Sequence, residues 1–499
     1  MMAFDMIGII TTMNRTQKLA LLFLGVFAVL LFVELPGSWL CDPDETRYAE
    51  IPREMLASHD FITPTLNGSH YFEKPPLLYW ADAAAMAVLG ENPFAARLPA
   101  RLATLGTAAA LAVGLAGTWG LTAGLWAALL FLSSMFGFVL GRINLTDGVL
   151  TFALTGAFLC LRRFFLEGAR GRRSWSSEIG LGFFGAMAML TKGLVGVVLP
   201  AAVAFLWIAV TGPWRRLREL ILSPMWIVFA GLSAPWFLLV EKANPGFAWF
   251  FFVHEHFLRY ATPGASRQGP LYYFIVTFAL GFLPWTFLFP QSLAFLKPDS
   301  AATWRRTLQQ DPDGLFFALW FFVVLGFFSL SHSKLIPYIF PLMPAASALA
   351  ARSLDRLPAW MGRTLAGLAC FYLILALIFP RIADEHSTTR LAMEGAKWRP
   401  EQVVCYRNFS PSLPWTLKRT VPVVEARGEL ADDGIMPPGL FWKEDEFWRR
   451  WNSGERFLAL VASGEREAFV HHEGPPPVMV AQNRKFTLFA NFALGPQKN

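Results

Sequence analysis

The stretch from Asp42 to Trp80 reads DPDETRYAEIPREMLASHDFITPTLNGSHYFEKPPLLYW and directly follows an apolar run at residues 19–40. It concentrates acidic and basic side chains in the most polar part of the first half of the chain. Ionisable groups within or beside a membrane are costly, and they usually mark a functional site. We therefore expect the chemistry of this protein to centre on this stretch.

The chain around this stretch has the composition of a membrane protein. Of its 499 residues, 55% are hydrophobic and 16% are charged, whereas a soluble chain is about 45–50% apolar and about 25% charged. The net charge of +7 does not indicate a nucleic-acid binder, because Lys and Arg lie in short loops and no basic-aromatic module is visible. The four cysteines form no CxxC pair, so they predict neither a disulfide framework nor a zinc knuckle.

Apolar windows of about 20 residues recur along the chain and predict a polytopic, all-α membrane body. The first window is too long for a signal-peptide core, so we interpret it as a retained span. We expect about eleven spans, at residues 19–40, 99–118, 121–140, 146–161, 178–191, 194–211, 221–240, 271–292, 314–330, 335–351 and 364–380.

The segment at residues 76–90 is apolar but short, so it could be a twelfth span or an interfacial helix. If it does not cross, the clusters of arginine in the later loops fall on the cytoplasmic side, as the positive-inside rule requires. We therefore favour an interfacial helix. This choice places residues 42–75, the 241–270 loop and the short polar motifs near Asp147, Lys192 and Lys334 together on the outer face.

The composition changes after Pro380, where short apolar, strand-like runs alternate with polar residues. This pattern predicts a small α/β domain. We expect a transmembrane domain at 1–380, with an outer juxtamembrane segment at 41–97, and a C-terminal domain at 381–499 on the outer face. The strands are expected at 402–406, 421–425, 457–461, 477–481 and 485–494, and a helical stretch at 413–419.

Asp44 and the Glu73-Lys74 pair are the first candidates for chemistry. A carboxylate at Asp44 can accept a proton from a hydroxyl or help to hold a metal; alternatively, Asp42 or Asp44 caps a helix at 45–58. Glu73 suits a divalent metal and Lys74 suits a phosphate. The alternative for Lys74 is an interfacial anchor at headgroup level, which would not account for Glu73.

Asp147 and two lysines are further candidates on the outer face. Asp147 starts a predicted span, so it is either a second acid facing the first or, with Thr146, an ordinary helix cap. Lys192 and Lys334 each interrupt apolar sequence at a membrane edge. Snorkelling explains one such lysine, whereas two facing a cavity fit the phosphate of a lipid headgroup better.

The 254–260 run contains two histidines that could bind a metal. His254 or His256, together with Glu73, would form a mixed nitrogen and oxygen site suited to zinc or manganese. The alternative is a structural role, which is more common for a single histidine. Arg259 and Arg267 could clamp a phosphate, or their side chains could snorkel to the headgroups.

These motifs as a set resemble the lipid A aminoarabinose transferase (ArnT-type) family, integral-membrane glycosyltransferases of the GT-C class that are related to protein O-mannosyltransferases. The resemblance rests on the 42–80 stretch, on ENPFAARLPA, LTKGLVG, APWF, EHFLRY, GFLPW and FSLSHSKLIPYIFPLMPA, and it covers most of residues 40–345. Beyond Pro380 it is faint. This chain also has fewer predicted spans near its C-terminus than the aminoarabinose enzymes, which leaves the acceptor open.

The resemblance implies a fold, a reaction and a set of site residues. The fold would be a GT-C membrane body with interfacial helices and a periplasmic α/β domain. Asp44, with Tyr48 one turn along, would match the first acid, Asp147 the second acid, Lys74 the donor-phosphate lysine, and Glu73 with a histidine the metal site. We assign the roles as follows: catalytic, Asp44, Lys74 and Asp147; donor-phosphate-binding, Tyr48, Tyr71, Lys74, Lys192, Arg259, Arg267 and Lys334; metal-binding, Glu73, His254 and His256.

The implied activity is transfer of a sugar from undecaprenyl phosphate to an acceptor on the outer face of the bacterial inner membrane. The acceptor would be lipid A, another glycolipid or a protein, and the cofactor a divalent metal, either zinc, manganese or magnesium. We expect membrane lipids but no nucleic acid among the partners. The alternative from a different class is a transporter of lipid-linked sugar, which would need inverted repeats and discontinuous helices around a midplane site.

Overall fold

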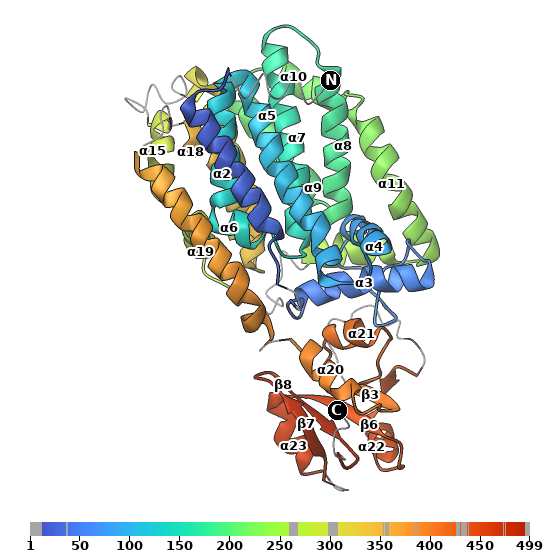
Figure 1. The fold of residues 1–499 in the computed structure, drawn as a ribbon. Coiled ribbons are helices and arrows are strands. Elements are labelled where there is room, and N and C mark those ends of the chain that lie inside the picture. Colours follow the sequence, from blue (N-terminus) through green and yellow to red (C-terminus); the bar gives the residue numbers. More distant parts are fainter. Residues whose placement is uncertain are drawn as a thin grey trace. The chain divides into compact units, whose positions relative to one another are not determined.

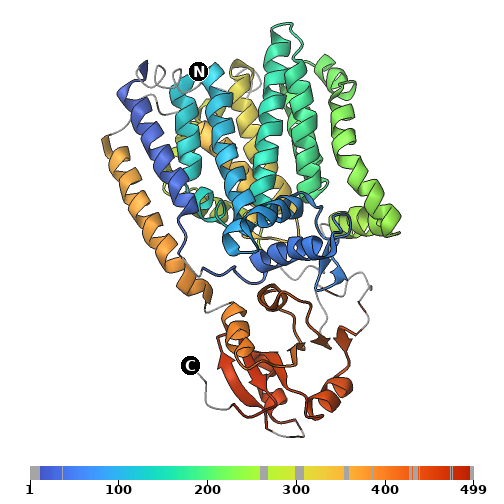
Figure 2. The same ribbon diagram turned by 45° about the vertical axis from the view of Figure 1, so that its right-hand side comes forward.

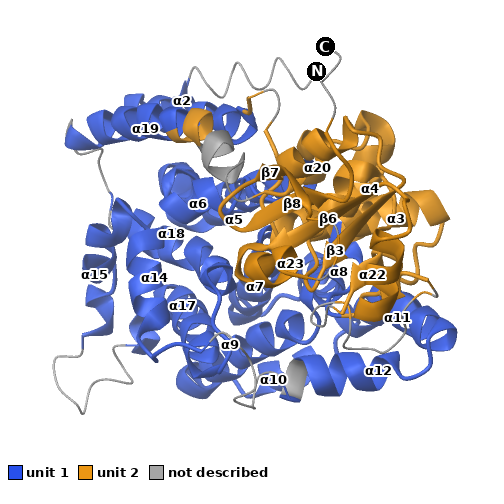
Figure 3. Cartoon of the chain, turned by 90° about the horizontal axis from the view of Figure 1, so that it is seen from below, with its two compact units in different colours: residues 1–33, 73–78, 98–374 blue, residues 34–72, 79–97, 375–499 orange. Residues whose placement is uncertain are grey.

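The computed structural model describes residues 12–35, 38–258, 268–297, 308–352, 359–384, 387–425, 439–472 and 476–494, together with Leu354, Leu430, Pro437 and Gly474. The chain forms two compact units (Figure 3). Unit 1 comprises residues 1–33, 73–78 and 98–374, and unit 2 comprises residues 34–72, 79–97 and 375–499. The predicted domain boundary at residue 380 stays a prediction.

Unit 1 is helical, because its apolar runs are long enough to satisfy every backbone group within a helix. Its long helices run side by side (Figures 1 and 2). A break within α5 occurs at Gly120, whose φ of 87° suits glycine. The main α-helices are α2 (Arg15–Phe32), α5 (Pro93–Ser133), α6 (Met135–Val139), α7 (Thr146–Ala169), α8 (Trp175–Lys192), α9 (Val195–Thr211), α10 (Arg215–Ile221), α11 (Met225–Ala243), α17 (Pro312–Leu330), α18 (Met343–Arg352) and α19 (Ala359–Asp384).

Shorter elements connect these helices. They include the π-helix η1 (Phe250–Leu258) and the 3₁₀-helix η4 (Ile336–Leu342), which packs against α7. The remaining ones are α12 (Phe247–Trp249), α14 (Tyr273–Gly281), η2 (Trp285–Leu288), α15 (Phe289–Ser292) and η3 (Ala294–Leu296).

Six helices in the described part of the chain are long and apolar enough to cross a membrane: Arg15–Phe32, Pro93–Ser133, Thr146–Ala169, Arg215–Ala243, Pro312–Leu330 and Trp360–Ile378. A seventh span is possible if Tyr273–Gly281 and Trp285–Leu296, which are bent by 108°, form one broken crossing. Leu77–Leu89 and Val195–Thr211 are shorter apolar helices. The prediction of a helical multi-span body is therefore confirmed.

The charged stretch at residues 42–80 folds mainly as a helix and a small hairpin. Helix α3 (Asp44–Ser58) confirms the helix predicted at 45–58, and strands β1 (Thr65–Leu66) and β2 (Ser69–His70) pair antiparallel. Helix α4 (Leu77–Leu89) occupies the short apolar segment that we expected to lie in the interface. Its placement in the interface stays a prediction.

The C-terminal part of unit 2 is a six-stranded mixed sheet in the order β5-β4-β3-β6-β8-β7. The β5, β4, β3 and β6 strands are parallel to their neighbours, whereas β8 pairs antiparallel with β6 and β7. Helices connect the strands, so the predicted α/β domain is confirmed. Its elements are α20 (Thr389–Ala396), β3 (Gln402–Tyr406), α21 (Ser412–Leu417), β4 (Val423–Val424), β5 (Phe441–Trp442), α22 (Glu444–Trp451), β6 (Phe457–Ala462), η5 (Ser463–Glu465), α23 (Arg466–Val470), β7 (Val478–Gln482) and β8 (Phe486–Ala490).

Candidate active site

The predicted acid Asp147 forms a buried ion pair with Lys192 in unit 1. The Lys192 Nζ donates a hydrogen bond of 2.5 Å to Asp147 Oδ1, and both side chains are less than 10% exposed. Asp147 lies in the first turn of α7 and Lys192 in the last turn of α8, so each charge also complements the dipole of its own helix. The ammonium lies 4.5 Å from the centre of the Tyr338 ring on η4.

This pair overturns the helix-cap interpretation of Asp147. The cap residue of α7 is Leu145, and no side-chain oxygen caps the helix there. The Asp147 carboxylate is instead directed to another helix, because α8 packs along α7 and brings its last residue to this level. Apolar residues of similar volume would often stabilise such a position equally well. The buried ion pair is therefore a candidate for a functional role.

Glu73 and Lys74 lie side by side in the segment of unit 1 that precedes α4. The Lys74 Nζ donates to the Glu73 carbonyl oxygen at 2.9 Å and lies 3.8 Å from Glu73 Oε2. Their side chains are 15% and 17% exposed, so each remains partly open to solvent. The two groups therefore offer one accessible carboxylate and one accessible ammonium at adjacent positions.

Lys334 has a local structural role in unit 1. Its Nζ donates to the carbonyl oxygens of Ser329 and Ser331 at 2.7 and 2.9 Å, which places a cation at the end of α17. Burial lowers the pKa of this lysine. Its assignment to a donor phosphate stays a prediction.

Unit 2 carries Asp44 and both predicted tyrosines around Arg47, a residue to which sequence analysis assigned no role. The Arg47 guanidinium donates to Asp44 Oδ1 and to the Tyr71 hydroxyl, each at 3.0 Å. It also lies 5.8 Å from the Tyr48 ring centre. Tyr48 and Tyr71 are buried, whereas the Asp44 side chain is 49% exposed. Arg47 therefore orients one carboxylate oxygen of Asp44 and leaves the group accessible.

The helix that carries Asp44 is fixed by a second arginine, Arg97. Its guanidinium donates two hydrogen bonds to the Glu45 carboxylate, at 2.7 and 2.8 Å, and one to the Trp39 carbonyl oxygen at 2.8 Å. It also pairs with Glu34. Glu45 is 1% exposed and in addition accepts from the Cys41 N–H. This network defines where α3 begins and therefore where Asp44 lies.

Asp42 joins the start of α3 to the C-terminal domain within unit 2. Its carboxylate accepts hydrogen bonds from the Thr46 hydroxyl at 2.6 Å, the Thr388 N–H at 3.1 Å and the Ser410 hydroxyl at 3.2 Å. The expectation that Asp42 or Asp44 caps α3 is wrong, because the cap residue is Pro43 and no side chain caps the helix. The Asp42 carboxylate instead binds Thr388 and Ser410 of the C-terminal domain.

The other end of α3 is held in the same way. Asn67 exchanges two hydrogen bonds with the Val421 backbone, at 2.8 and 2.9 Å. Arg53 donates two hydrogen bonds to Glu50 and lies 3.4 Å from the Lys418 carbonyl oxygen. Burial raises the pKa of Glu50 to about 8, against the opposing effect of Arg53. The C-terminal domain therefore contacts the charged stretch at both ends.

We expect Asp42→Ala to destabilise unit 2 by about 2–3 kcal/mol, because a carboxylate that accepts several hydrogen bonds is lost. The measurement is thermal unfolding of the purified protein in detergent, followed by limited proteolysis of the C-terminal domain. Asp445→Ala is the matched control, since that carboxylate is exposed on α22. Equal midpoints for the two variants would contradict the role of Asp42.

The predicted metal site is only partly within the described residues. His254 lies on η1, where its ring stacks on Phe250 with centroids 5.1 Å apart and its Nδ1 lies 3.7 Å from Glu255. The side chain of His256 and all of Arg259 and Arg267 lie outside the described residues. Within the ranges that the structure describes, no three His, Cys, Asp or Glu side chains gather as a metal site. The metal stays a prediction that depends on His256.

The fold and these sites define a multi-span membrane protein whose candidate charges occupy helix ends. A family model described as dolichyl-phosphate-mannose-protein mannosyltransferase matches residues 19–295, which is more than half of the chain. The chain belongs to this family.

Two sets of relatives refine this membership. The chain is 35% identical over 369 residues to undecaprenyl phosphate-alpha-4-amino-4-deoxy-L-arabinose arabinosyl transferase 2 of Pseudomonas fluorescens, covering 71% of this chain and 60% of that protein. The transferase 1 of Sodalis glossinidius is 36% identical over 68% of this chain and 60% of its own length. The chain thus spans about 60% of the length of these curated relatives.

Among solved structures, ArnT from Cupriavidus metallidurans bound to undecaprenyl phosphate matches with a TM-score of 0.82 and 26% identity, over 96% of this chain and 99% of that one. The archaeal oligosaccharyltransferase AglB from Archaeoglobus fulgidus matches with a TM-score of 0.51 and 12% identity, over 90% of this chain and 70% of the other. The second likeness concerns the fold alone.

Proposed function

We propose that this protein is a glycosyltransferase that moves 4-amino-4-deoxy-L-arabinose from undecaprenyl phosphate to lipid A. One observation carries the proposal: the structure of ArnT with bound undecaprenyl phosphate matches nearly the whole of this chain. The names of the curated relatives support the same donor. Transfer to a lipid headgroup takes place at the membrane surface. Charged groups at helix ends are less costly there than charged groups at midspan.

The chemistry proposed for the charged groups follows from the leaving group, which is a lipid phosphate. Its departure builds negative charge, and cations placed beforehand stabilise that charge. Lys74 is accessible and Lys192 is held by Asp147, so these are the proposed phosphate ligands. A divalent metal at Glu73 and His256, if bound, would supply further positive charge to the phosphate. No step is assigned to it.

Asp44 is proposed as the group nearest the acceptor. Its side chain is half exposed, and one carboxylate oxygen accepts a hydrogen bond from Arg47. The second oxygen can therefore receive a proton. If the acceptor is a hydroxyl, Asp44 acts as general base. If the acceptor is a phosphate, little base is needed, and Asp44 orients or balances charge.

The proposed topology has about eleven spans, with the candidate residues on the outer face of the inner membrane. The placement of Asp147 and Lys192 on one face is supported by their positions at the start of α7 and the end of α8. These helices are antiparallel neighbours, so both charges belong to one end of the bundle. The basic α7–α8 connection then belongs to the cytoplasmic end.

We expect Asp44→Asn, Glu73→Gln and Lys74→Ala each to reduce sugar transfer by about 100-fold or more. Lys74→Ala removes a cation that stabilises the leaving phosphate, Asp44→Asn removes the proposed general base, and Glu73→Gln removes a proposed metal ligand. The assay uses membranes, radiolabelled donor and lipid A, and it measures labelled lipid A and free undecaprenyl phosphate. Asp60→Asn is the control from the same stretch, since the Asp60 carboxylate accepts hydrogen bonds from the Ile62 and Thr63 N–H groups in an exposed turn. Full activity in all three test variants contradicts the mechanism.

The same assay separates the alternatives. Protein O-glycosylation, which the description of the family model favours, would place the label in the protein fraction and not in extracted lipid. A transporter would move intact donor across reconstituted vesicles and release no free undecaprenyl phosphate.

A further inference from the structure

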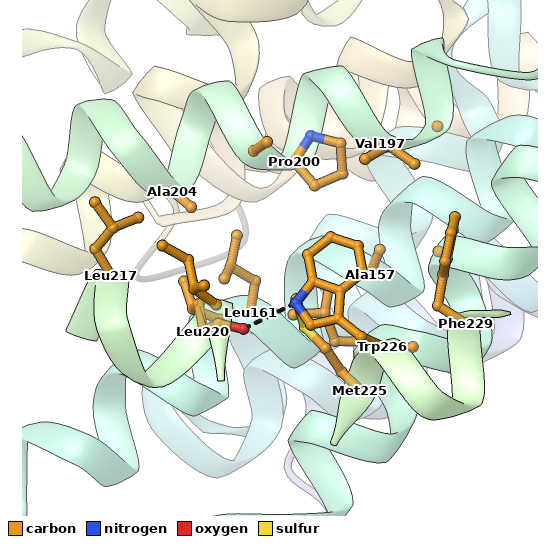
Figure 4. A pocket seen from close by; sticks show the side chains of 16 residues that line it. Ala157, Leu161, Val197, Pro200, Ala204, Leu217, Leu220, Met225, Trp226 and Phe229 are labelled. Atoms are coloured by element: carbon orange, nitrogen blue, oxygen red, sulfur yellow. Dashed lines mark hydrogen bonds between the residues drawn. The ribbon is translucent and has the colours of Figure 1, made fainter. Parts of the chain in front are cut away.

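An apolar pocket of about 190 Å³ lies among helices of unit 1, in the described part of the chain (Figure 4). A dry apolar cavity of about 150 Å³ is already large enough to bind benzene, so this pocket has room for part of a hydrocarbon chain. Gly182, Gly185 and Gly196 contribute to its space because they have no side chains. Its lining residues are Ala157, Leu161, Leu181, Gly182, Gly185, Gly196, Val197, Pro200, Ala201, Ala204, Leu217, Leu220, Ile221, Met225, Trp226 and Phe229.

Most of the pocket lies away from the buried Asp147–Lys192 pair of the candidate active site. Along α7, Ala157 and Leu161 lie about 15–20 Å from Asp147 at 1.5 Å per residue, and Leu181 on α8 lies about as far from Lys192. From these residues the pocket extends to the side chains that α10 and the start of α11 contribute. On α7 and α8 the ion pair and the pocket lining occupy different levels, whereas Gly196 and Val197 in the first turn of α9 carry the lining toward the level of Lys192.

Positive charge gathers beside the pocket. Helix α10 contributes Leu217, Leu220 and Ile221 to the lining, and the same short helix carries three arginines. The connection from α7 to α8 adds three more. Residues 167–178 and 215–219 together hold six arginines and three glutamates, an excess of three positive charges. Arg170, Arg172, Arg173 and Arg215 pair with these glutamates, yet their side chains are all more than half exposed.

Tryptophans mark the level at which these arginines lie. Trp175, Trp214 and Trp226 are 55%, 52% and 42% exposed, and such side chains are enriched where hydrocarbon meets headgroups. Arg173 lies 3.9 Å from the Trp175 ring centre. Trp226 donates its Nε1 hydrogen to the Leu220 carbonyl oxygen at 3.1 Å, which fixes one pocket wall, as Figure 4 shows. The pocket thus begins just beneath the headgroup level.

We propose that this pocket binds one acyl chain of an anionic phospholipid from the leaflet at the α10 end, with the lipid phosphate held by the neighbouring arginines. Apolar walls bind the chain, and the excess positive charge selects an anionic headgroup over a zwitterionic one. Basic pockets between transmembrane helices on the cytoplasmic side bind anionic lipids by this combination. The proposal does not depend on the transfer reaction.

Native mass spectrometry of the purified protein, exposed to phosphatidylglycerol or phosphatidylethanolamine in detergent, tests this proposal. Gly185→Leu fills the pocket, and a Cβ there meets Phe229 at 3.4 Å, an ordinary contact. Gly231→Leu on α11 is the matched control, since a Cβ there has no atom within 4 Å. The double variant Arg215→Gln/Arg218→Gln removes two of the positive charges that are proposed to hold the headgroup. It changes no residue that lines the pocket.

We expect the wild-type protein and Gly231→Leu to retain one phosphatidylglycerol, and both test variants to bind it at least tenfold more weakly. Thermal unfolding confirms that each variant is folded. Equal retention of the two lipids by the wild-type protein overturns the charge argument. Equal binding by Gly185→Leu and Gly231→Leu overturns the assignment of the acyl chain to this pocket. Retention of added undecaprenyl phosphate in place of phosphatidylglycerol overturns the assignment to a phospholipid.

Discussion

Lys192→Met will produce one of the two largest effects, because it leaves the Asp147 carboxylate buried without the ammonium to which it is bonded at 2.5 Å. Breaking a buried ion pair by removing one partner costs about 3–5 kcal/mol. We therefore expect a much lower thermal midpoint in detergent. We also expect sugar transfer to fall by about 100-fold or more, because a cation proposed to bind the donor phosphate is gone.

The double variant Asp147→Asn/Lys192→Met separates stability from activity. It replaces both charges with groups of similar size, so it should recover most of the lost stability. If the pair acts on the donor, transfer stays low in this folded protein. Recovery of both stability and transfer would show that the pair is only structural.

Arg97→Met should destabilise unit 2 at least as strongly. It would leave Glu34 and Glu45 without the guanidinium that both contact, and their side chains are only 12% and 2% exposed. Two carboxylates that share a desolvated site repel one another, and the cost of the broken pairs is about 3–5 kcal/mol. We expect little folded protein when membranes are extracted and analysed by fluorescence-detected size exclusion.

Arg170→Met provides the matched control for Arg97→Met. Arg170 also pairs with a glutamate, Glu167, but it is 58% exposed, and such surface pairs contribute about 0–1 kcal/mol. The triple variant Arg97→Met/Glu34→Gln/Glu45→Gln should restore part of the folded fraction by removing the repulsion. A folded yield for Arg97→Met equal to that of Arg170→Met would contradict the proposed network.

Features with a local signature were predicted well from the sequence. Helix α3 was expected at 45–58 and is observed at Asp44–Ser58, and strand β3 was expected at 402–406 and is observed at Gln402–Tyr406. Both follow from short-range patterns of charge and apolar residues. Strand β5 (Phe441–Trp442) was missed, because a strand of two residues has no periodicity to detect.

The cap assignments show where local reasoning failed. Asp42 and Asp147 each stand where a cap is chemically favourable. Their carboxylates bind instead to Thr388 and Lys192, which are 346 and 45 residues away in the sequence. Arg97 was visible in the motif ENPFAARLPA, but its partner Glu45 lies 52 residues earlier. No local pattern indicates such pairs.

The recurring apolar windows of about 20 residues by themselves determined that this is a multi-span membrane protein, and the charged stretch at residues 42–80 predicted chemistry beside its spans, because so many charges next to apolar helices are costly. It also determined the helix that carries Asp44. Only the tertiary structure decided which charges are paired: Asp44 with Arg47, Glu45 with Arg97, Asp42 with the C-terminal domain and Asp147 with Lys192. The physical reason is that burial makes an unpaired charge costly, and the available partner depends on which helix ends meet in space.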